Sequence, residues 1–312
     1  MEIFLRSISG ILVILGMILV GFVIGEKGWF DDKSRGLIAK LVTQVALPCY
    51  MLYTITQRFT AAALLKMLPE LRFPALSMVI LLGIATAVAR IFVVRQDHRG
   101  LFISMFFNSN TIFVGLPINQ ALFGYASIPY VLIYYMCNTT FFWTLGTYLI
   151  QRDGEGEAQF DLKTSLKKVF SPPLVGFLLG LVLVILHIKL PTFLASDLQY
   201  LGNLTTPLSM IFIGLSVSNA GLKQLTLKKD QFLILLGRFV VAPLLMATIV
   251  YWAPLPSLMK QVFIIQSAMP VMTNAPVVAR LYGADSDYAA VMVTETTLAT
   301  MVVIPILMVL MA

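Results

Sequence analysis

Residues 108–124 read NSNTIFVGLPINQALFG, and residues 267–283 read SAMPVMTNAPVVARLYG. The two stretches lie 159 positions apart, and at that offset Pro117 matches Pro276 and Gly124 matches Gly283. The same offset relates further pairs along the chain: Gly21 with Gly180, Pro48 with Pro207 and Met51 with Met210. Prolines that recur in register within apolar sequence indicate an internal repeat, and both copies are expected to contain helices interrupted at the same places.

The composition indicates a membrane protein. The chain is 59% hydrophobic and 12% charged, with a mean hydropathy of +0.89, whereas soluble domains are about half apolar and about a quarter charged. We expect an all-α membrane protein with about ten transmembrane helices, arranged as two inverted five-helix repeats, 1–150 and 169–312, joined by a polar linker at 151–168. The apolar segments are 8–25, 36–56, 74–94, 99–123, 126–150, 169–188, 198–219, 231–252, 257–282 and 286–311.

The basic residues predict the orientation of the chain in the membrane. Of the 22 Lys and Arg, fourteen lie in or beside loops that follow odd-numbered segments, six lie on the other side, and Lys40 and Arg238 lie inside segments. By the positive-inside rule, the linker is cytoplasmic and both termini are outside. The net charge of +7 therefore reflects topology and indicates no nucleic-acid partner. We expect an integral plasma-membrane protein, as in a bacterial inner membrane.

The fourth and ninth segments, 99–123 and 257–282, contain the strongest helix breakers, because each combines proline with nearby asparagine, threonine or glycine. Unwound backbone is tolerated within a bilayer only where protein or a cavity surrounds it. Proline suits the first turn of a helix, so we expect Pro117 and Pro276 to begin half-helices whose positive ends converge on an anion. The candidate substrate-binding residues are Asn110, Gly115, Pro117, Thr273, Asn274 and Pro276, with Asn108 as a secondary candidate.

Residues 110–117, NTIFVGLP, followed by Phe123 and Gly124, resemble the fourth-helix signature of the auxin efflux carrier family, N-T-x-x-x-G-x-P ending in an aromatic residue and glycine. The ninth segment, from Ile265 to Gly283, is similar to the family's other crossing helix. The resemblance extends over nearly the whole chain.

The resemblance implies a fold in which the fourth and ninth helices cross at broken points, and transport of small organic acids by an elevator-like motion. It also implies a scaffold of the first, second, sixth and seventh helices, through which a homodimer can form, and a moving part made of the others. Plant members carry a long cytoplasmic loop where this chain has only 151–168. The chain is therefore more similar to the prokaryotic branch, which includes malonate and malate carriers, and auxin is not indicated as the solute.

Three polar residues inside other apolar segments each have two interpretations. Glu295, midway along 286–311, either couples transport to a proton or cation or makes structural hydrogen bonds with neighbouring threonines. Arg238 either extends to the cytoplasmic interface or neutralises a solute carboxylate. Asn138, which the repeat aligns with Thr297, is a secondary substrate candidate, and its other role is helix packing.

The sequence predicts neither a metal nor a cofactor. His98 and His187 lie far apart, and Cys49 and Cys137 lie within apolar runs, where cysteine packs as a small hydrophobic residue. The leading prediction is a permease for small organic anions such as mono- or dicarboxylates. An enzyme is not expected, because Glu295 has no second central carboxylate to form an acid/base pair. A membrane-embedded sensor or receptor of organic acids, which binds without transport, stays the alternative.

Overall fold

The structure is a computed structural model that describes residues 2–154, 162–220 and 228–311. Within these ranges every regular element is a helix or helical turn, apart from one isolated bridge between two residues. The all-α prediction is thereby confirmed. Contacts divide the chain into two compact units. Unit 1 contains Met1–Ile14, Glu70–Leu166 and Ala220–Ala312, and unit 2 contains Leu15–Pro69 and Lys167–Asn219.

The two units do not coincide with the two predicted repeats. Unit 2 takes most of the first predicted segment together with the second, sixth and seventh, and unit 1 takes the third to fifth and the eighth to tenth. The family resemblance assigns the segments of unit 2 to a scaffold and those of unit 1 to a moving part, and that assignment of roles stays a prediction. Each unit therefore contains helices from both halves of the sequence.

In the part of the chain that the structure describes, five helical stretches are long and apolar enough to cross a membrane: Lys33–Arg58, Ala61–Ile91, Thr192–Asn219, Lys229–Tyr251 and Ser286–Met311. Two shorter apolar helices, Leu12–Glu26 and Pro172–Ile185, fall in the first and sixth predicted segments. The fourth and ninth segments are each divided between two helices. A total of ten spans in two inverted repeats therefore stays a prediction.

Unit 2 is built from α-helices and one π-helical turn, Val42–Ala46. Pro48 lies second in α3, immediately after that turn, where a wider helical turn accommodates the missing N–H group of proline. The helices are α1 (Glu2–Glu26, shared with unit 1), α2 (Asp32–Leu41), α3 (Leu47–Arg58), α4 (Ala61–Met67), α11 (Pro172–Ile185), α12 (Thr192–Asn203) and α13 (Thr205–Ala220).

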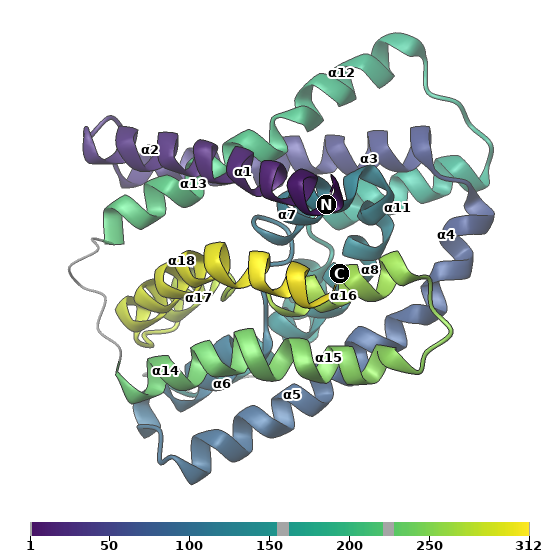
Figure 1. Cartoon of the computed structure of the whole chain (residues 1–312). Helices are drawn as coiled ribbons and strands as arrows, with labels where there is room; N and C mark the ends of the chain where they lie inside the picture. Colours follow the sequence, from purple (N-terminus) through teal and green to yellow (C-terminus); the bar gives the residue numbers. More distant parts are fainter. Residues whose placement is uncertain (1, 155–161, 221–227, 312) are drawn as a thin grey trace. The chain divides into compact units, whose positions relative to one another are not determined.

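The repeat-matched glycines Gly21 and Gly180 both lie where helices of unit 2 approach closely. A Cβ atom on Gly21 of α1 would lie 2.3 Å from the Ile211 carbonyl oxygen in α13. A Cβ atom on Gly180 of α11 would lie 3.0 Å from Cβ of Ile55 in α3, and α3 and α11 lie side by side (Figure 1). Small residues let membrane helices pack backbone to backbone. Each half of the sequence thus contributes one helix whose glycine lets it pack closely against a helix of the other half.

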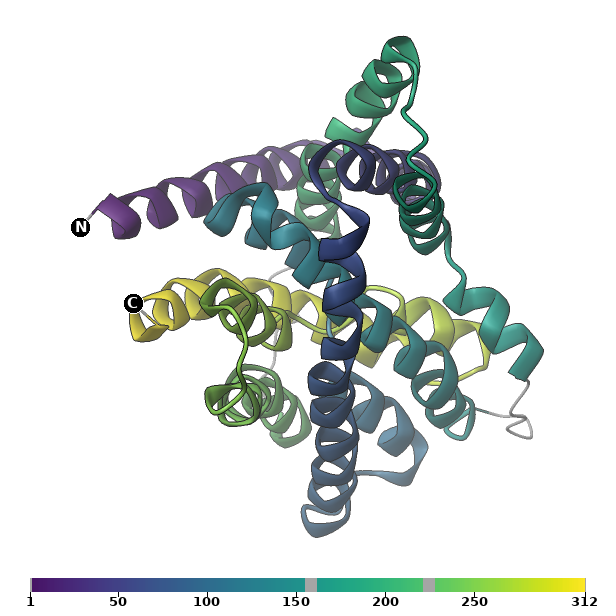
Figure 2. The same cartoon turned by 90° about the vertical axis from the view of Figure 1, so that its right-hand side faces the viewer.

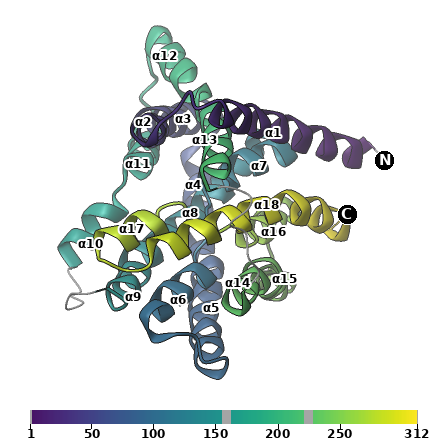
Figure 3. The same cartoon turned by 90° about the vertical axis from the view of Figure 1, so that its left-hand side faces the viewer.

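Unit 1 contains the remaining helices and two further π-helical turns, Phe142–Gly146 and Gly237–Val241. The long helix α5 packs against α6 and α15 (Figure 2), and α6 also contacts α14 (Figure 3). The helices are α5 (Arg72–Ile91), α6 (Arg99–Phe107), α7 (Gly115–Phe123), α8 (Ile128–Phe141), α9 (Thr147–Gln151), α14 (Lys229–Leu236), α15 (Ala242–Tyr251), α16 (Ser257–Ser267), α17 (Ala275–Leu281) and α18 (Ser286–Met311).

The predicted linker at 151–168 is helical at its end. Helix α10 (Leu162–Val169) begins within it and leads towards α11. The middle of the linker, 155–161, lies outside the described residues.

Candidate functional site

Two irregular stretches meet inside unit 1. Residues 108–114 separate α6 from α7, and residues 268–274 separate α16 from α17. They run antiparallel side by side, because Ser109 forms a bridge with Val271. Together these stretches form the crossing. Helix α7 contacts α16 and α17 contacts α6, so the second helix of each pair packs against the first helix of the other.

The sequence around Asn110 explains why the first helix stops. The side-chain Oδ1 of Asn110 accepts the N–H group of Phe113 at 3.1 Å, which is the local bond that makes asparagine favour turns over helix. Its own N–H group donates to the Pro270 carbonyl at 2.8 Å, across the crossing. Pro270 has no N–H group, so it cannot continue a helix ladder in the second stretch.

The prolines predicted to begin half-helices lie in first turns. Pro117 is the third residue of α7, and Pro276 is the second residue of α17. First-turn N–H groups have no partner within the helix, so proline costs nothing there. The two half-helices are unequal, because α7 has 9 residues and α17 has 7.

Helices α8 and α18 each hold one side of the crossing. Asn138 of α8 accepts the Ser109 N–H at 2.8 Å and donates to the Ser109 carbonyl at 2.7 Å. The hydroxyl oxygen of Thr296 in α18 accepts the N–H group of Val271 at 3.0 Å. Both partners of the bridge thus have backbone groups satisfied by a side chain from another helix. Asn138 was predicted as a candidate from the sequence, whereas Thr296 was not. Thr296 is the neighbour of Thr297, which the 159-residue offset aligns with Asn138.

Arg238 is completely buried, with 0% of its surface exposed. The interpretation that it extends to the membrane interface is therefore wrong. Its Nε donates to the Met269 carbonyl at 3.1 Å, its Nη1 donates to the Phe106 carbonyl at 3.1 Å, and its Nη2 donates to the carbonyls of Ser267 and Met269. Phe106 lies near the end of α6 and Ser267 ends α16, so one guanidinium joins the ends of the two interrupted helices.

The predicted substrate-binding residues differ in burial. Asn108 and Asn110 are 1% and 2% exposed, whereas Thr273, Asn274 and Pro276 are partly exposed. The Nδ2 group of Asn110 is buried and has no hydrogen-bond partner among the described residues. Within the same residues no hydrogen bond joins Asn110 to Asn274. The structure brings their two stretches together but does not pair their side chains.

Gln266 belongs to the ninth segment and was not among the predicted site residues, yet it lies beside Gly115. Its Nε2 donates to the Thr111 carbonyl at 3.2 Å. A Cβ atom on Gly115 would lie 2.2 Å from Oε1 of Gln266, so the glycine leaves the space that this amide occupies. The signal that could have found Gln266 is a long amide side chain in an apolar segment, directly before a helix break.

Glu295 is 9% exposed and lies on α18 directly before Thr296, the residue that bonds the crossing. Glu295, predicted as the coupling carboxylate, is therefore the sequence neighbour of the residue that bonds Val271 in the second stretch. Among the described residues, no three His, Cys, Asp or Glu side chains gather as a possible metal site.

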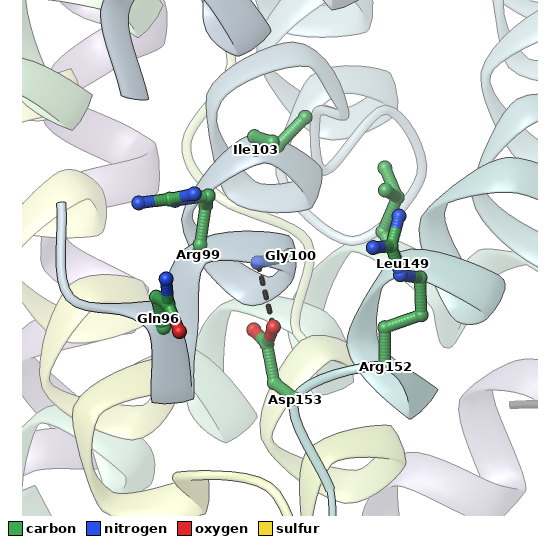
Figure 4. A pocket seen from close by; sticks show the side chains of 7 residues that line it. All are labelled: Gln96, Arg99, Gly100, Ile103, Leu149, Arg152 and Asp153. Atoms are coloured by element: carbon green, nitrogen blue, oxygen red, sulfur yellow. Dashed lines mark hydrogen bonds between the residues drawn. The ribbon is translucent and has the colours of Figure 1, made fainter. Parts of the chain in front are cut away.

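A cavity of about 340 Å³ lies at the start of α6 (Figure 4), away from the predicted site residues. The Asp153 carboxylate accepts the N–H groups of Gly100 at 2.9 Å and Leu101 at 2.6 Å, and so caps α6 from a distant part of the chain. Burial raises the pKa of this carboxyl, while the two N–H groups oppose the rise. The cavity is lined by Gln96, Arg99, Gly100, Ile103, Leu149, Arg152 and Asp153.

Comparison with known proteins finds related transporters. The chain is 27% identical over 305 residues to an uncharacterized transporter from Methanocaldococcus jannaschii, with 94% of this chain and 95% of the relative covered. It is 26% identical over 312 residues to an uncharacterized transporter from Methanothermobacter thermautotrophicus, with 97% and 98% covered. Both relatives are archaeal.

The sequence model of the family described as membrane transport protein matches residues 7–308. With the apolar helices described above, this identifies an integral membrane protein that transports and is not an enzyme. The resemblance to the auxin efflux carrier family is confirmed, and the chain belongs to this membrane transport protein family.

Proposed function

We propose that this protein is a permease for small organic anions, such as mono- or dicarboxylates, and that the crossing binds the solute. The observation that carries the proposal is the buried Nδ2 group of Asn110, which has no partner among the described residues. Leaving a buried donor unsatisfied costs about 1–3 kcal/mol. A carboxylate oxygen bound there would remove that cost.

The start of α7 supports an anionic solute. The support comes from the helix dipole, because Gly115 already donates its N–H group to the Asn110 carbonyl at 3.0 Å and Pro117 has no N–H group. Val114, which precedes the helix, makes no side-chain cap. A helix start favours negative charge nearby. Asn110 lies five positions before Gly115, the first residue of α7, so an amide donor and a helix terminus can address one carboxylate.

The division into two units supports an elevator-like mechanism. All the residues that form the crossing, with Asn138, Arg238 and Glu295, belong to unit 1. In the proposed cycle unit 1 carries the solute across the membrane, while unit 2 stays fixed and forms a homodimer through the first, second, sixth and seventh segments. Glu295 is the proposed proton- or cation-coupling residue.

The proposed architecture is two inverted repeats, 1–150 and 169–312, with a cytoplasmic linker and both termini outside a plasma membrane. The matching helix interruptions support the repeat. At an offset of 159, Phe107 and Gly115, which bound the first interruption, correspond to 266 and 274, each one residue before the bounds Ser267 and Ala275 of the second.

Transport by purified protein tests the proposal. The full chain is reconstituted in lipid vesicles, and uptake of radiolabelled malonate, malate and acetate is compared with that of a neutral sugar. Protein-dependent uptake of at least one acid without chemical change supports a permease. Saturable binding of the acids without uptake would identify a sensor instead, and neither binding nor uptake of any acid would overturn the proposed solute class.

A further inference from the structure

We propose that the guanidinium of Arg238 is a built-in cation of the crossing, and that it occupies the position which an inorganic cation would otherwise have to fill. The inference deepens the proposed function, on which it rests for the crossing being the solute site. It assigns Arg238 a positioning role, and it specifies that the crossing needs no bound alkali metal ion.

The arrangement of the carbonyl groups carries this inference. Four hydrogen bonds connect the guanidinium to the carbonyl oxygens of Phe106, Ser267 and Met269. These carbonyls lie where helices α6 and α16 end, so they have lost intrahelical partners. Carbonyls at the ends of interrupted helices are the ligands that many transporters offer to a coupling cation. In this chain a side chain takes that place.

The charges balance without a carboxylate. The C-terminus of a helix carries about −0.5 elementary charge, so the ends of α6 and α16 together offset about one positive charge. Among the described residues Arg238 makes no ion pair with an acidic side chain. Because the helix ends neutralise it, the guanidinium does not neutralise the solute, and the start of α7 remains the positive element for an anion.

The local backbone places this side chain at the crossing. Arg238 lies in the π-helical turn Gly237–Val241, and such wide turns redirect side chains at functional sites. A Cβ atom on Gly237 would lie 2.3 Å from the ring of Phe106, so the absent side chain lets this turn approach α6. Lysine would supply the charge without the planar fork that reaches several carbonyls at once.

Cross-linking across the bridge measures the crossing without any solute. Ser109 and Val271 are replaced by cysteine in a chain that carries Cys49→Ser and Cys137→Ser. A protease site is inserted at 155–161, and after cleavage only the cross-linked halves run together on a non-reducing gel. Antiparallel bridge partners have Cα atoms about 4.5–5.5 Å apart, within disulfide range. A control pair, Ser109→Cys with Val277→Cys, uses an exposed position on α17 and should not cross-link.

With Arg238 intact, the cross-linking rate should be the same in sodium, potassium and N-methylglucamine chloride. Arg238→Ala should lower the rate at least fivefold, and millimolar methylguanidinium should restore it while neutral methylurea does not. A saturable increase with sodium or potassium when Arg238 is present would overturn the proposal. So would a folded Arg238→Ala protein that cross-links at the original rate, or that methylguanidinium fails to restore.

If Arg238→Ala yields no folded protein, Arg238→Lys and Arg238→Gln decide. The proposal requires the charged lysine variant to cross-link at least twice as fast as the neutral glutamine variant, and equal rates would overturn it. Because no solute is added, these results are independent of transport. If the vesicles neither bind nor take up any acid while the cross-linking rates follow the pattern expected above, the proposed function is wrong and the role of Arg238 still holds.

Discussion

Asn138 and Ser109 form a reciprocal hydrogen-bonded pair. The Asn138 amide accepts the Ser109 N–H at 2.8 Å and donates to the Ser109 carbonyl at 2.7 Å, and both residues are 0% exposed. One side chain thus bonds both the N–H group and the carbonyl of Ser109, as a neighbouring strand bonds a residue in a β-sheet. Irregular backbone inside a membrane protein must form its hydrogen bonds within the protein. The first stretch of the crossing can therefore stay non-helical at Ser109 because Asn138 bonds both of its backbone groups.

Replacing Asn138 with alanine should destabilise the fold. Two buried backbone groups would lose their partners, at a cost of about 1–3 kcal/mol each in unfolding free energy. Thr140→Ala is the matched control, because Thr140 lies on the same helix, is exposed, and its hydroxyl donates to the Met136 carbonyl of that helix. Thermal and SDS unfolding in detergent provide the measurement. Equal stability of the two variants would contradict the assigned role of Asn138.

Gly115 and Gln266 should be energetically coupled. Gly115→Ala places a Cβ atom on the Gln266 amide, which must move away and release the Thr111 carbonyl. We expect Gly115→Ala to cost less in a Gln266→Ala background than in the natural chain, with a coupling energy of about 0.5–3 kcal/mol.

A double-mutant cycle on unfolding free energy measures this coupling. Gly83→Ala serves as the control substitution, because a Cβ atom there meets nothing within 4 Å. Additive effects of Gly115→Ala and Gln266→Ala would show that the two side chains do not share this space.

Asn110→Ala and Asn274→Ala should weaken solute binding. Loss of a hydrogen bond to a charged group costs about 1.5–3 kcal/mol, which lowers affinity by roughly 10- to 100-fold. The buried Asn110 should show the larger effect, since Asn274 is partly exposed. Asn203→Ala, on an exposed position of unit 2, is the control. Unchanged transport affinity in both variants would remove these side chains from the solute site.

Glu295→Gln should abolish the dependence of transport on a pH gradient while sparing solute binding. The substitution keeps the shape of this buried side chain and removes its titration. Asp197→Asn changes an exposed acid in unit 2 and should leave the pH response intact. Uptake into vesicles with and without an imposed gradient provides the readout. Full gradient-driven accumulation by Glu295→Gln would place coupling elsewhere.

Cysteine labelling should locate the linker in the cytoplasm. In a chain with Cys49 and Cys137 replaced by serine, a cysteine at position 156 should react with an impermeant maleimide only after the cells are opened, whereas a cysteine added after Ala312 should react in intact cells. The prediction rests on the asymmetry of Lys and Arg between the two sides. Labelling of position 156 from outside would reverse the assigned topology.

The sequence alone predicted the helical membrane class, the family and the two interruptions of regular helix. These features depend on local chemistry. Apolar length determines which segments suit a bilayer, and proline removes a donor wherever it occurs. The 159-residue offset then identified Pro117 and Pro276 as corresponding positions, and both lie in the first turn of a helix that follows an interruption.

The tertiary structure decided which side chains hold the crossing. Arg238 bonds a carbonyl 132 residues away, and Gln266 bonds one 155 residues away. Neither partner can be read from spacing, because a donor's choice of acceptor depends on how the chain brings distant backbone groups together. The sequence therefore determined where the helices must break, while the folded chain determined that Asn138, Thr296 and Arg238 satisfy the backbone those breaks expose.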